Sequence, residues 1–142
     1  MGYEMIKIAE SKDEWVACYS IVHELRAHLS VDEYLAMLDV LHVEGYKLAY
    51  LQVDGQVVCC AGFHMQSTLF MGRYMYVDDL VTGAAHRSLH YGAQMMDWLK
   101  AYGREHECKN LTLCSGVQRF SAHKFYLNQG FKIASHYFTQ EL

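Results

Sequence analysis

Hydrophobic and polar positions follow two different spacings along the first third of this chain. Residues 3–8 alternate loosely between apolar and polar and predict a first strand. Ser11 and Ser30 each open a capping box, a serine followed three positions later by a glutamate, and apolar residues then recur at helical spacing. We therefore expect two successive helices after the first strand, with the second ending naturally at Gly45.

The centre of the chain has the pattern of a β-hairpin. Residues 46–53 and 56–65 are strand-like, and the Asp54-Gly55 pair between them suits the positive φ angles of a two-residue turn. Residues 57–63 are nearly all apolar. A run of this kind is typical of a central strand that is buried on both faces.

The second half of the chain continues to alternate between strand and helix patterns. The expected elements are a strand at 70–82, a helix from Leu89 to about Glu105, a strand at 110–114, a helix at 121–129 and closing strands at 131–133 and 136–139. The order β-α-α-β-β-β-α-β-α-β-β predicts the α/β class, with a mixed sheet that carries helices on both faces.

Composition and charge narrow the function. A length of 142 residues suits one domain, 1–142, and the 52% hydrophobic content is that of a globular protein. The net charge of −4 and the lack of a basic block argue against nucleic acid as a partner. The stretches without charge are too polar to span a membrane, and the first residues lack the pattern of a signal peptide, so we expect a cytoplasmic protein.

The cysteines and histidines do not predict a metal site. The five cysteines form no CxxC pair and no zinc-type cluster with histidine, and the nine histidines include no HExxH motif. We interpret the cysteines as reduced and mostly buried thiols.

The segment 87–93 is the strongest candidate for a ligand site. It follows a strand and begins a helix, where unpaired backbone N–H groups and the helix dipole favour a phosphate group. Gly92 allows close approach to the backbone, and Arg87 adds a planar positive charge. The segment consists of Arg87, Ser88, Leu89, His90, Tyr91, Gly92 and Ala93. It predicts a phosphorylated cofactor.

Three blocks of sequence resemble the GNAT superfamily of acyl-CoA-dependent N-acetyltransferases, and the order of elements matches over essentially the whole chain. The blocks are Leu80-Val81, the segment 87–93 with the pattern of the pyrophosphate motif, and Ala122 with Tyr126 and Gly130-Phe131. The chain departs from the family pattern in two places. His90 stands where the family has the first motif glycine, and Arg119 stands where an asparagine is common.

The resemblance implies direct transfer of an acetyl group from acetyl-CoA to a primary amine of a small molecule, peptide or protein. The backbone of Leu80, Val81 and Thr82 would pair with the pantetheine arm, and residues 88–93 would hold the pyrophosphate. A backbone N–H near Leu80 would stabilise the oxyanion. No metal is implied.

The resemblance also implies catalytic roles for two residues. Tyr126 matches the tyrosine that returns a proton to the leaving thiolate, although it could instead be a packed aromatic. Asp79, next to Leu80, is the candidate base or water-positioning group, and its alternative is a solvated side chain. Alternation along a strand places Asp78 on the opposite face unless a bulge intervenes. His64 could face the same cleft, but we interpret it as a core histidine.

A second function class stays open at this point. A non-catalytic acyl-CoA-binding or sensory domain of the same fold would explain the unusual His90 and Arg119, whereas Tyr126 and Asp79 favour an enzyme. The sequence does not identify the amine acceptor, the acyl chain or the oligomeric state, for which a homodimer is one alternative.

Overall fold

The computed structural model describes residues 4–142, which form two compact units, 4–112 and Leu113–Leu142. The predicted strand at 3–8 is present as β1 (Glu4–Ile8), and Tyr3 lies outside the described residues. The other elements of the first unit are α1 (Lys12–Leu25), α2 (Val31–Val43), β2 (Lys47–Val53), β3 (Gln56–Thr68), β4 (Gly72–Thr82), the short 3-10 helix η1 (Ala84–His86), α3 (Tyr91–Glu105) and the beginning of β5 (Asn110–Leu113).

Both early helices begin as predicted. Ser11 accepts a hydrogen bond from the backbone N–H of Glu14, and Ser30 forms a complete capping box with Glu33. The Glu14 carboxylate also accepts hydrogen bonds from the Tyr50 hydroxyl and the Ser11 hydroxyl. The bond from Tyr50 is the main reason that the pKa of Glu14 falls to about 2. The capping residues thus also tie α1 to the sheet.

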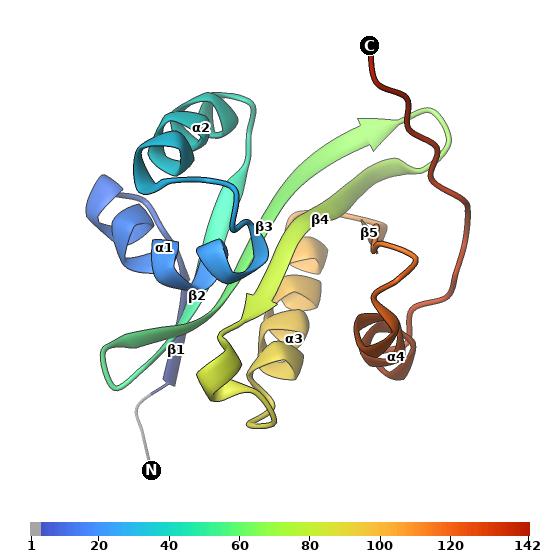
Figure 1. Ribbon diagram of the computed structural model, residues 1–142. Helices are drawn as coiled ribbons and strands as arrows, with labels where there is room; N and C mark the ends of the chain where they lie inside the picture. Colours follow the sequence, from blue (N-terminus) through green and yellow to red (C-terminus); the bar gives the residue numbers. More distant parts are fainter. Residues whose placement is uncertain (1–3) are drawn as a thin grey trace. The chain divides into compact units, whose positions relative to one another are not determined.

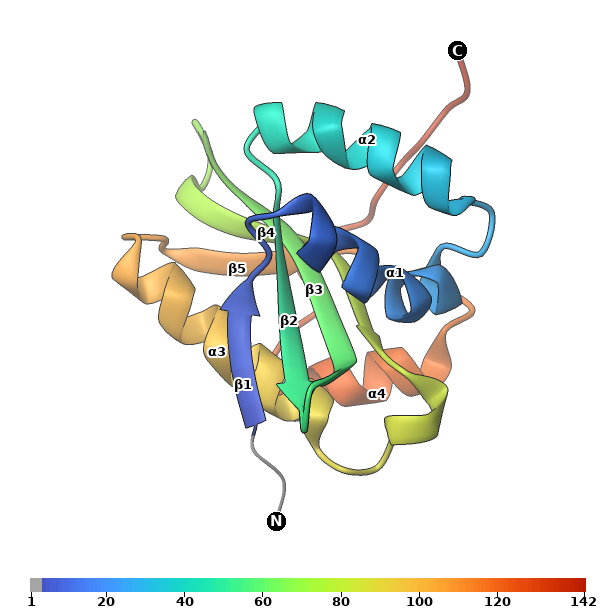
Figure 2. The same cartoon turned by 90° about the vertical axis from the view of Figure 1, so that its left-hand side faces the viewer.

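The strands form one sheet in the order β1-β2-β3-β4-β5, and β1 to β4 pair antiparallel. Asp54 and Gly55 adopt φ angles of 51° and 81°, which confirms the predicted two-residue turn between β2 and β3. Helices α1 and α2 cover one face of the sheet and α3 covers the other (Figures 1 and 2). The predicted α/β class is confirmed.

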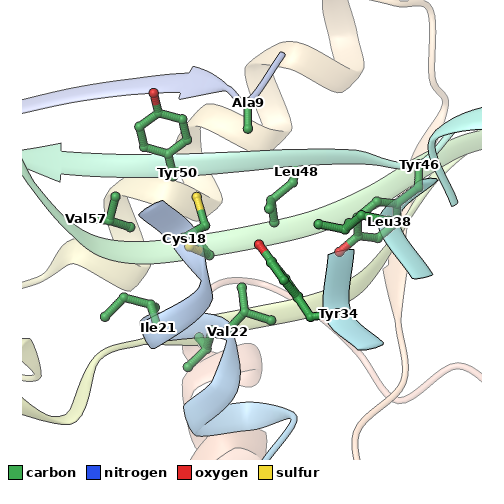
Figure 3. Close-up of a cluster of buried hydrophobic side chains, with 12 residues drawn as sticks. Ala9, Cys18, Ile21, Val22, Tyr34, Leu38, Tyr46, Leu48, Tyr50 and Val57 are labelled. Atoms are coloured by element: carbon green, nitrogen blue, oxygen red, sulfur yellow. The ribbon is translucent and has the colours of Figure 1, made fainter. Parts of the chain in front are cut away.

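The core fills both faces of the central strands. On the α1 and α2 face, a cluster of buried side chains includes Cys18, Val22, Leu38 and Leu48 (Figure 3). On the other face, the ring of Phe63 lies against Trp98 and Tyr102 of α3. Residues 57–63 are all buried, as the apolar run predicted.

The second unit contains α4 (Phe120–Asn128), which confirms the predicted short helix. Gly130 follows α4 with a φ angle of 93°, in the left-handed region that ends helices. The two predicted closing strands are wrong, because residues 131–142 form no strand in the structure. A strand requires a neighbour for its backbone N–H and C=O groups, and within this unit the strand residues end at Leu113.

Candidate active site

The connection from β4 to α3 carries the predicted phosphate-binding segment. Two backbone hydrogen bonds fix where the connection begins. The N–H of Gly83 donates to the carbonyl of Val58 at 2.9 Å, and the N–H of Ala84 donates to the carboxylate of Glu24 at 2.8 Å. Glu24 therefore anchors the connection from α1, a role that the sequence analysis did not predict.

The start of α3 differs chemically from the starts of α1 and α2. Its N-cap residue is His90, which makes no side-chain capping bond, and its first turn contains no acidic residue. The first N–H groups of a helix have no partner within the helix. The backbone N–H groups of Tyr91, Gly92 and Ala93 therefore present positive partial charge, and the turn that carries them contains no acidic residue.

His90 adopts the left-handed conformation, with φ 65° and ψ 17°. An L-residue with a β-carbon pays a conformational cost of about 1–2 kcal/mol there, whereas glycine does not. The family pattern has glycine at this position, so the unusual residue keeps the backbone shape that a glycine would favour.

We predict that His90→Gly raises the free energy of unfolding by about 1 kcal/mol, because relief of the left-handed strain exceeds the added entropy of the unfolded chain. Urea denaturation measures this change. Leu89→Gly is the control, since Leu89 is not among the residues with positive φ, and it should destabilise the protein. Equal destabilisation by both glycines would contradict the strain at His90.

Asp79 is held by two donors from elsewhere in the first unit. The Nε of Arg26, at the end of α1, lies 2.8 Å from one carboxylate oxygen, and the hydroxyl of Tyr46 donates to the other at 2.7 Å. Arg26 also donates through Nη2 to the carbonyl of Asp78 at 3.0 Å. The carboxylate that the sequence predicted as a base thus has a protein donor on each oxygen.

A β-bulge in β4 brings Asp78 to the same region. Gly62 of β3 pairs with Asp79 and Phe63 pairs with Val77, so Asp78 is the extra residue between them. The simple alternation that would place Asp78 on the opposite face therefore does not hold. Its carboxylate oxygen instead lies 2.7 Å from Nδ1 of His64.

Nδ1 of His64 and the Asp78 carboxylate oxygen are in close polar contact, and both atoms are buried without another hydrogen-bond partner. Burial raises the pKa of Asp78, and the nearby His64 acts in the opposite direction. The sequence predicted a core histidine, whereas His64 is only partly buried, with 24% of its side chain exposed.

Tyr46 links the two acidic residues of β4. Its hydroxyl bonds Asp79, and the edge of its ring meets the ring of His64 with 5.9 Å between centroids. Burial, followed by the charge of Asp79, raises the pKa of Tyr46 well above its usual value, so its hydroxyl stays a donor. Gly62 makes room for this side chain, because a β-carbon there would overlap the phenol.

Tyr126 lies on α4 in the second unit. Its ring meets Phe125 and Phe131 at centroid distances of 5.6 Å and 5.8 Å, and its carbonyl accepts the N–H of Phe131. Burial raises its pKa, while Arg119 acts in the opposite direction. The phenol is therefore protonated at neutral pH, as a proton donor must be.

The predicted site residues of β4 lie together at its end, and the structure adds three residues around Asp79 that were not predicted. Asp79, Leu80, Val81 and Thr82 occupy consecutive positions at the end of β4, and the segment 87–93 follows after Gly83 and η1. Sequence analysis missed Arg26, Tyr46 and Gly62. A signal for Gly62 was available, because an isolated glycine in an apolar strand indicates a bulge or a close approach.

A surface groove lies elsewhere, between α1 and the β2–β3 hairpin, and none of the predicted site residues lines it. Its walls include Asp13, Glu14, Tyr50 and Gln56. Among residues 4–142, no group of histidine, cysteine, aspartate or glutamate could hold a metal ion. Within that same part of the chain, no helix is both long and apolar enough to cross a membrane.

Comparison with known proteins adds independent information on this arrangement. A model of the Acetyltransferase (GNAT) family matches residues 8–131. The chain is 33% identical over 137 residues to the uncharacterized N-acetyltransferase YhdJ of Bacillus subtilis, covering 95% of this chain and 96% of YhdJ. It is 30% identical over 98 residues to the aminoalkylphosphonate N-acetyltransferase of Salmonella typhimurium, covering 68% of this chain and 62% of that protein.

The fold is similar to that of solved acetyltransferases. The aminoglycoside N-acetyltransferase AAC(6')-Iy in complex with CoA superimposes with a TM-score of 0.87 at 12% identity, covering 100% of this chain and 96% of that chain.

Proposed function

Since the chain belongs to the acetyltransferase (GNAT) family and is an acyl-CoA-dependent N-acetyltransferase, we propose that acetyl-CoA binds along the end of β4 and the start of α3. Acetyl-CoA is the co-substrate and an amine is the acceptor. The observation that carries the proposed site is the start of α3, which has no side-chain cap and follows β4 through η1. The pyrophosphate would supply the negative charge that this helix start lacks.

Several features of the segment 87–93 support its role in binding pyrophosphate. The N–H groups of Tyr91, Gly92 and Ala93 begin the helix, and Ser88 and His90 adopt positive φ angles that shape the turn before it. Successive backbone N–H groups in such a turn form a concave site for anions. Arg87 would add a bidentate contact to a phosphate oxygen pair.

The end of β4 is suited to hold the pantetheine arm. Leu80, Val81 and Thr82 pair with β3 on one side. The N–H of Lys109 donates to the carbonyl of Arg73, which places the beginning of β5 beside the opposite end of β4. The amides of a pantetheine arm could therefore pair with residues 80–82 like an added strand.

The proposed reaction is direct attack of the amine on the thioester carbonyl. The C–N bond forms, and a backbone N–H near Leu80 stabilises the oxyanion. The C–S bond then breaks, and the thiolate of CoA takes the phenolic proton of Tyr126. The nitrogen that has attacked loses a proton as the amide forms. That proton goes to the tyrosinate, so Tyr126 returns to its starting state.

The acceptor is proposed to be a primary amine of a small molecule or a peptide. The carboxylate of Asp78 on β4 supports this proposal, because a carboxylate close to the proposed thioester site would attract an ammonium group. An aminoalkylphosphonate and an aminoglycoside are reasonable first candidates, since proteins similar to this chain are named for them.

Three further proposals concern the whole chain. Residues 1–142 act as one functional domain, which is supported by a family match that extends across both compact units. The enzyme works in the cytoplasm, and its five free cysteines are typical of a reducing compartment. A homodimer is compatible with exposed apolar side chains on α2, such as Met37, Val40 and Val43.

Release of free CoA tests the proposed function. The chain is incubated with acetyl-CoA and, separately, an aminoalkylphosphonate, an aminoglycoside and a lysine-containing peptide, and the thiol and the acetylated product are both measured. We expect equal amounts of CoA and acetylated amine from at least one acceptor. If acetyl-CoA raises the melting temperature but no amine releases CoA, a non-catalytic acyl-CoA-binding domain replaces this proposal.

A further inference from the structure

We propose that His64, held by Asp78, removes the proton from the acceptor ammonium group, and that Asp79 is a positioning residue rather than the base. This inference rests on the proposed function, because it assigns a step within that amine acetylation. It changes the role that the sequence predicted for Asp79 and gives a function to a histidine that the sequence placed in the core.

The geometry of His64 is that of a base oriented by a carboxylate. Nδ1 is buried and lies 2.7 Å from Asp78, whereas the whole side chain keeps 24% exposure. The exposed part of the side chain therefore lies away from Nδ1, and Nε2 is the remaining nitrogen that could accept a proton. A carboxylate at Nδ1 favours the tautomer that leaves a free lone pair on Nε2, and it stabilises the imidazolium once Nε2 accepts a proton.

Asp79 is poorly placed to accept a proton. One of its oxygens contacts the guanidinium of Arg26 at 2.8 Å, and the other accepts the Tyr46 hydroxyl at 2.7 Å. Both carboxylate oxygens are therefore already engaged by protein donors. Protonation of Asp79 would weaken both contacts, so this carboxylate is better suited to hold Arg26 and Tyr46 in place.

Tyr46 connects this anchor to His64. The two rings meet edge to face, so the contact from Tyr46 to Asp79 limits the orientations of the histidine. The titratable groups next to His64 are Asp78 on β4, Tyr46 before β2, and Tyr76, which pairs with His64 across the β3–β4 ladder. Asp79 and Arg26 lie one contact further away, through Tyr46 and Asp78.

The proton balance of the step is simple. An acceptor arrives as R–NH₃⁺ and transfers one proton to Nε2 of His64, which becomes an imidazolium beside the Asp78 carboxylate. The neutral amine attacks the thioester, and its second proton replaces the one that Tyr126 gives to the thiolate. The products are the acetamide, CoA thiol and one proton, which His64 releases to water.

The test is the pH dependence of kcat/KM for His64→Gln, measured with the best amine of the panel. At pH 7 we expect a loss of about 10² to 10⁴-fold, the usual contribution of a general base. A base acts only in its unprotonated form, so the wild-type kcat/KM falls at acidic pH. In the variant only the amine that is already neutral in solution reacts, so kcat/KM keeps rising with pH and shows no acidic limb that levels off. The difference in kcat/KM between variant and wild type therefore shrinks at high pH.

Two controls accompany this variant. His106→Gln changes another partly buried histidine, whose Nδ1 contacts the Tyr102 carbonyl at the end of α3, and it should keep the wild-type profile. The dissociation constant of acetyl-CoA and the melting temperature of His64→Gln should stay close to wild type. Asp78→Asn should also lower kcat/KM, as His64→Gln does, because it removes the carboxylate that orients His64 and stabilises the imidazolium.

Failure of this inference is distinguishable from failure of the proposed function. If the wild type acetylates an amine and His64→Gln keeps both its rate at pH 7 and its acidic limb, His64 is not the base, although the proposed function stands. If Asp79→Asn instead removes the acidic limb while His64→Gln retains it, Asp79 is the base. If the wild type releases no CoA with any amine, the proposed function fails, and this assignment fails with it.

Discussion

Tyr126→Phe is expected to lower kcat by about 10² to 10⁴-fold, which is the usual contribution of general acid catalysis. The substitution keeps the ring and its contacts with Phe125 and Phe131, and it removes only the hydroxyl. Burial keeps that hydroxyl protonated at neutral pH, so the wild type has a proton to give. Steady-state kinetics at saturating acetyl-CoA and amine measure the change.

Tyr102→Phe is the matched control for this prediction. Tyr102 is also a tyrosine whose pKa is raised by burial, but its ring stacks between Trp98 and His106 on α3. It should retain the wild-type kcat. An unchanged kcat in Tyr126→Phe would mean that the thiolate leaves unprotonated or takes its proton from water, and Tyr126 would then be a packing residue.

Gly62→Ala should cost about 3 kcal/mol or more in the free energy of unfolding. The new β-carbon would overlap the hydroxyl and ring of Tyr46, whose side chain is only 7% exposed. The ring must leave its site, and loss of a buried aromatic costs about 3–5 kcal/mol. The same displacement breaks the hydrogen bond to Asp79, so activity should fall together with stability.

A double-mutant cycle measures the cause of this loss. In a Tyr46→Ala background the overlap disappears, so Gly62→Ala should add little further cost. Gly103→Ala is the control, since its β-carbon would meet Met75 and Cys108 at ordinary contact distances of 3.5 Å and 3.7 Å. That change should stabilise α3 by about 0.5–1 kcal/mol. An equal cost for Gly62→Ala in both backgrounds would exclude Tyr46 as the reason.

Elements that depend on neighbouring residues could be predicted from the sequence. The serine caps of α1 and α2 and the Asp54-Gly55 turn each need only a few consecutive residues. The segment 87–93 belongs to the same class, because a strand followed by a helix start is a local pattern. The closing strands did not follow this rule, since their formation depends on a partner strand elsewhere.

The arrangement around Asp79 could not be predicted in the same way. Its partners Arg26 and Tyr46 are 53 and 33 positions away in the sequence, and no local pattern connects them. The bulge at Asp78 follows from the pairing of β3 with β4, in which one residue is left over. Alternation within β4 alone predicts the wrong face for that carboxylate, and it hides the contact with His64.

Cofactor binding at the start of α3 is tested most directly by amide hydrogen exchange with and without CoA. Cofactor binding at the start of α3 predicts that the amides of residues 88–93 exchange more slowly when CoA is bound, together with those at the end of β4. The groove between α1 and the β2–β3 hairpin should exchange at the same rate in both samples. Protection at that groove without protection at 88–93 would mean that CoA binds at the groove and not at the start of α3.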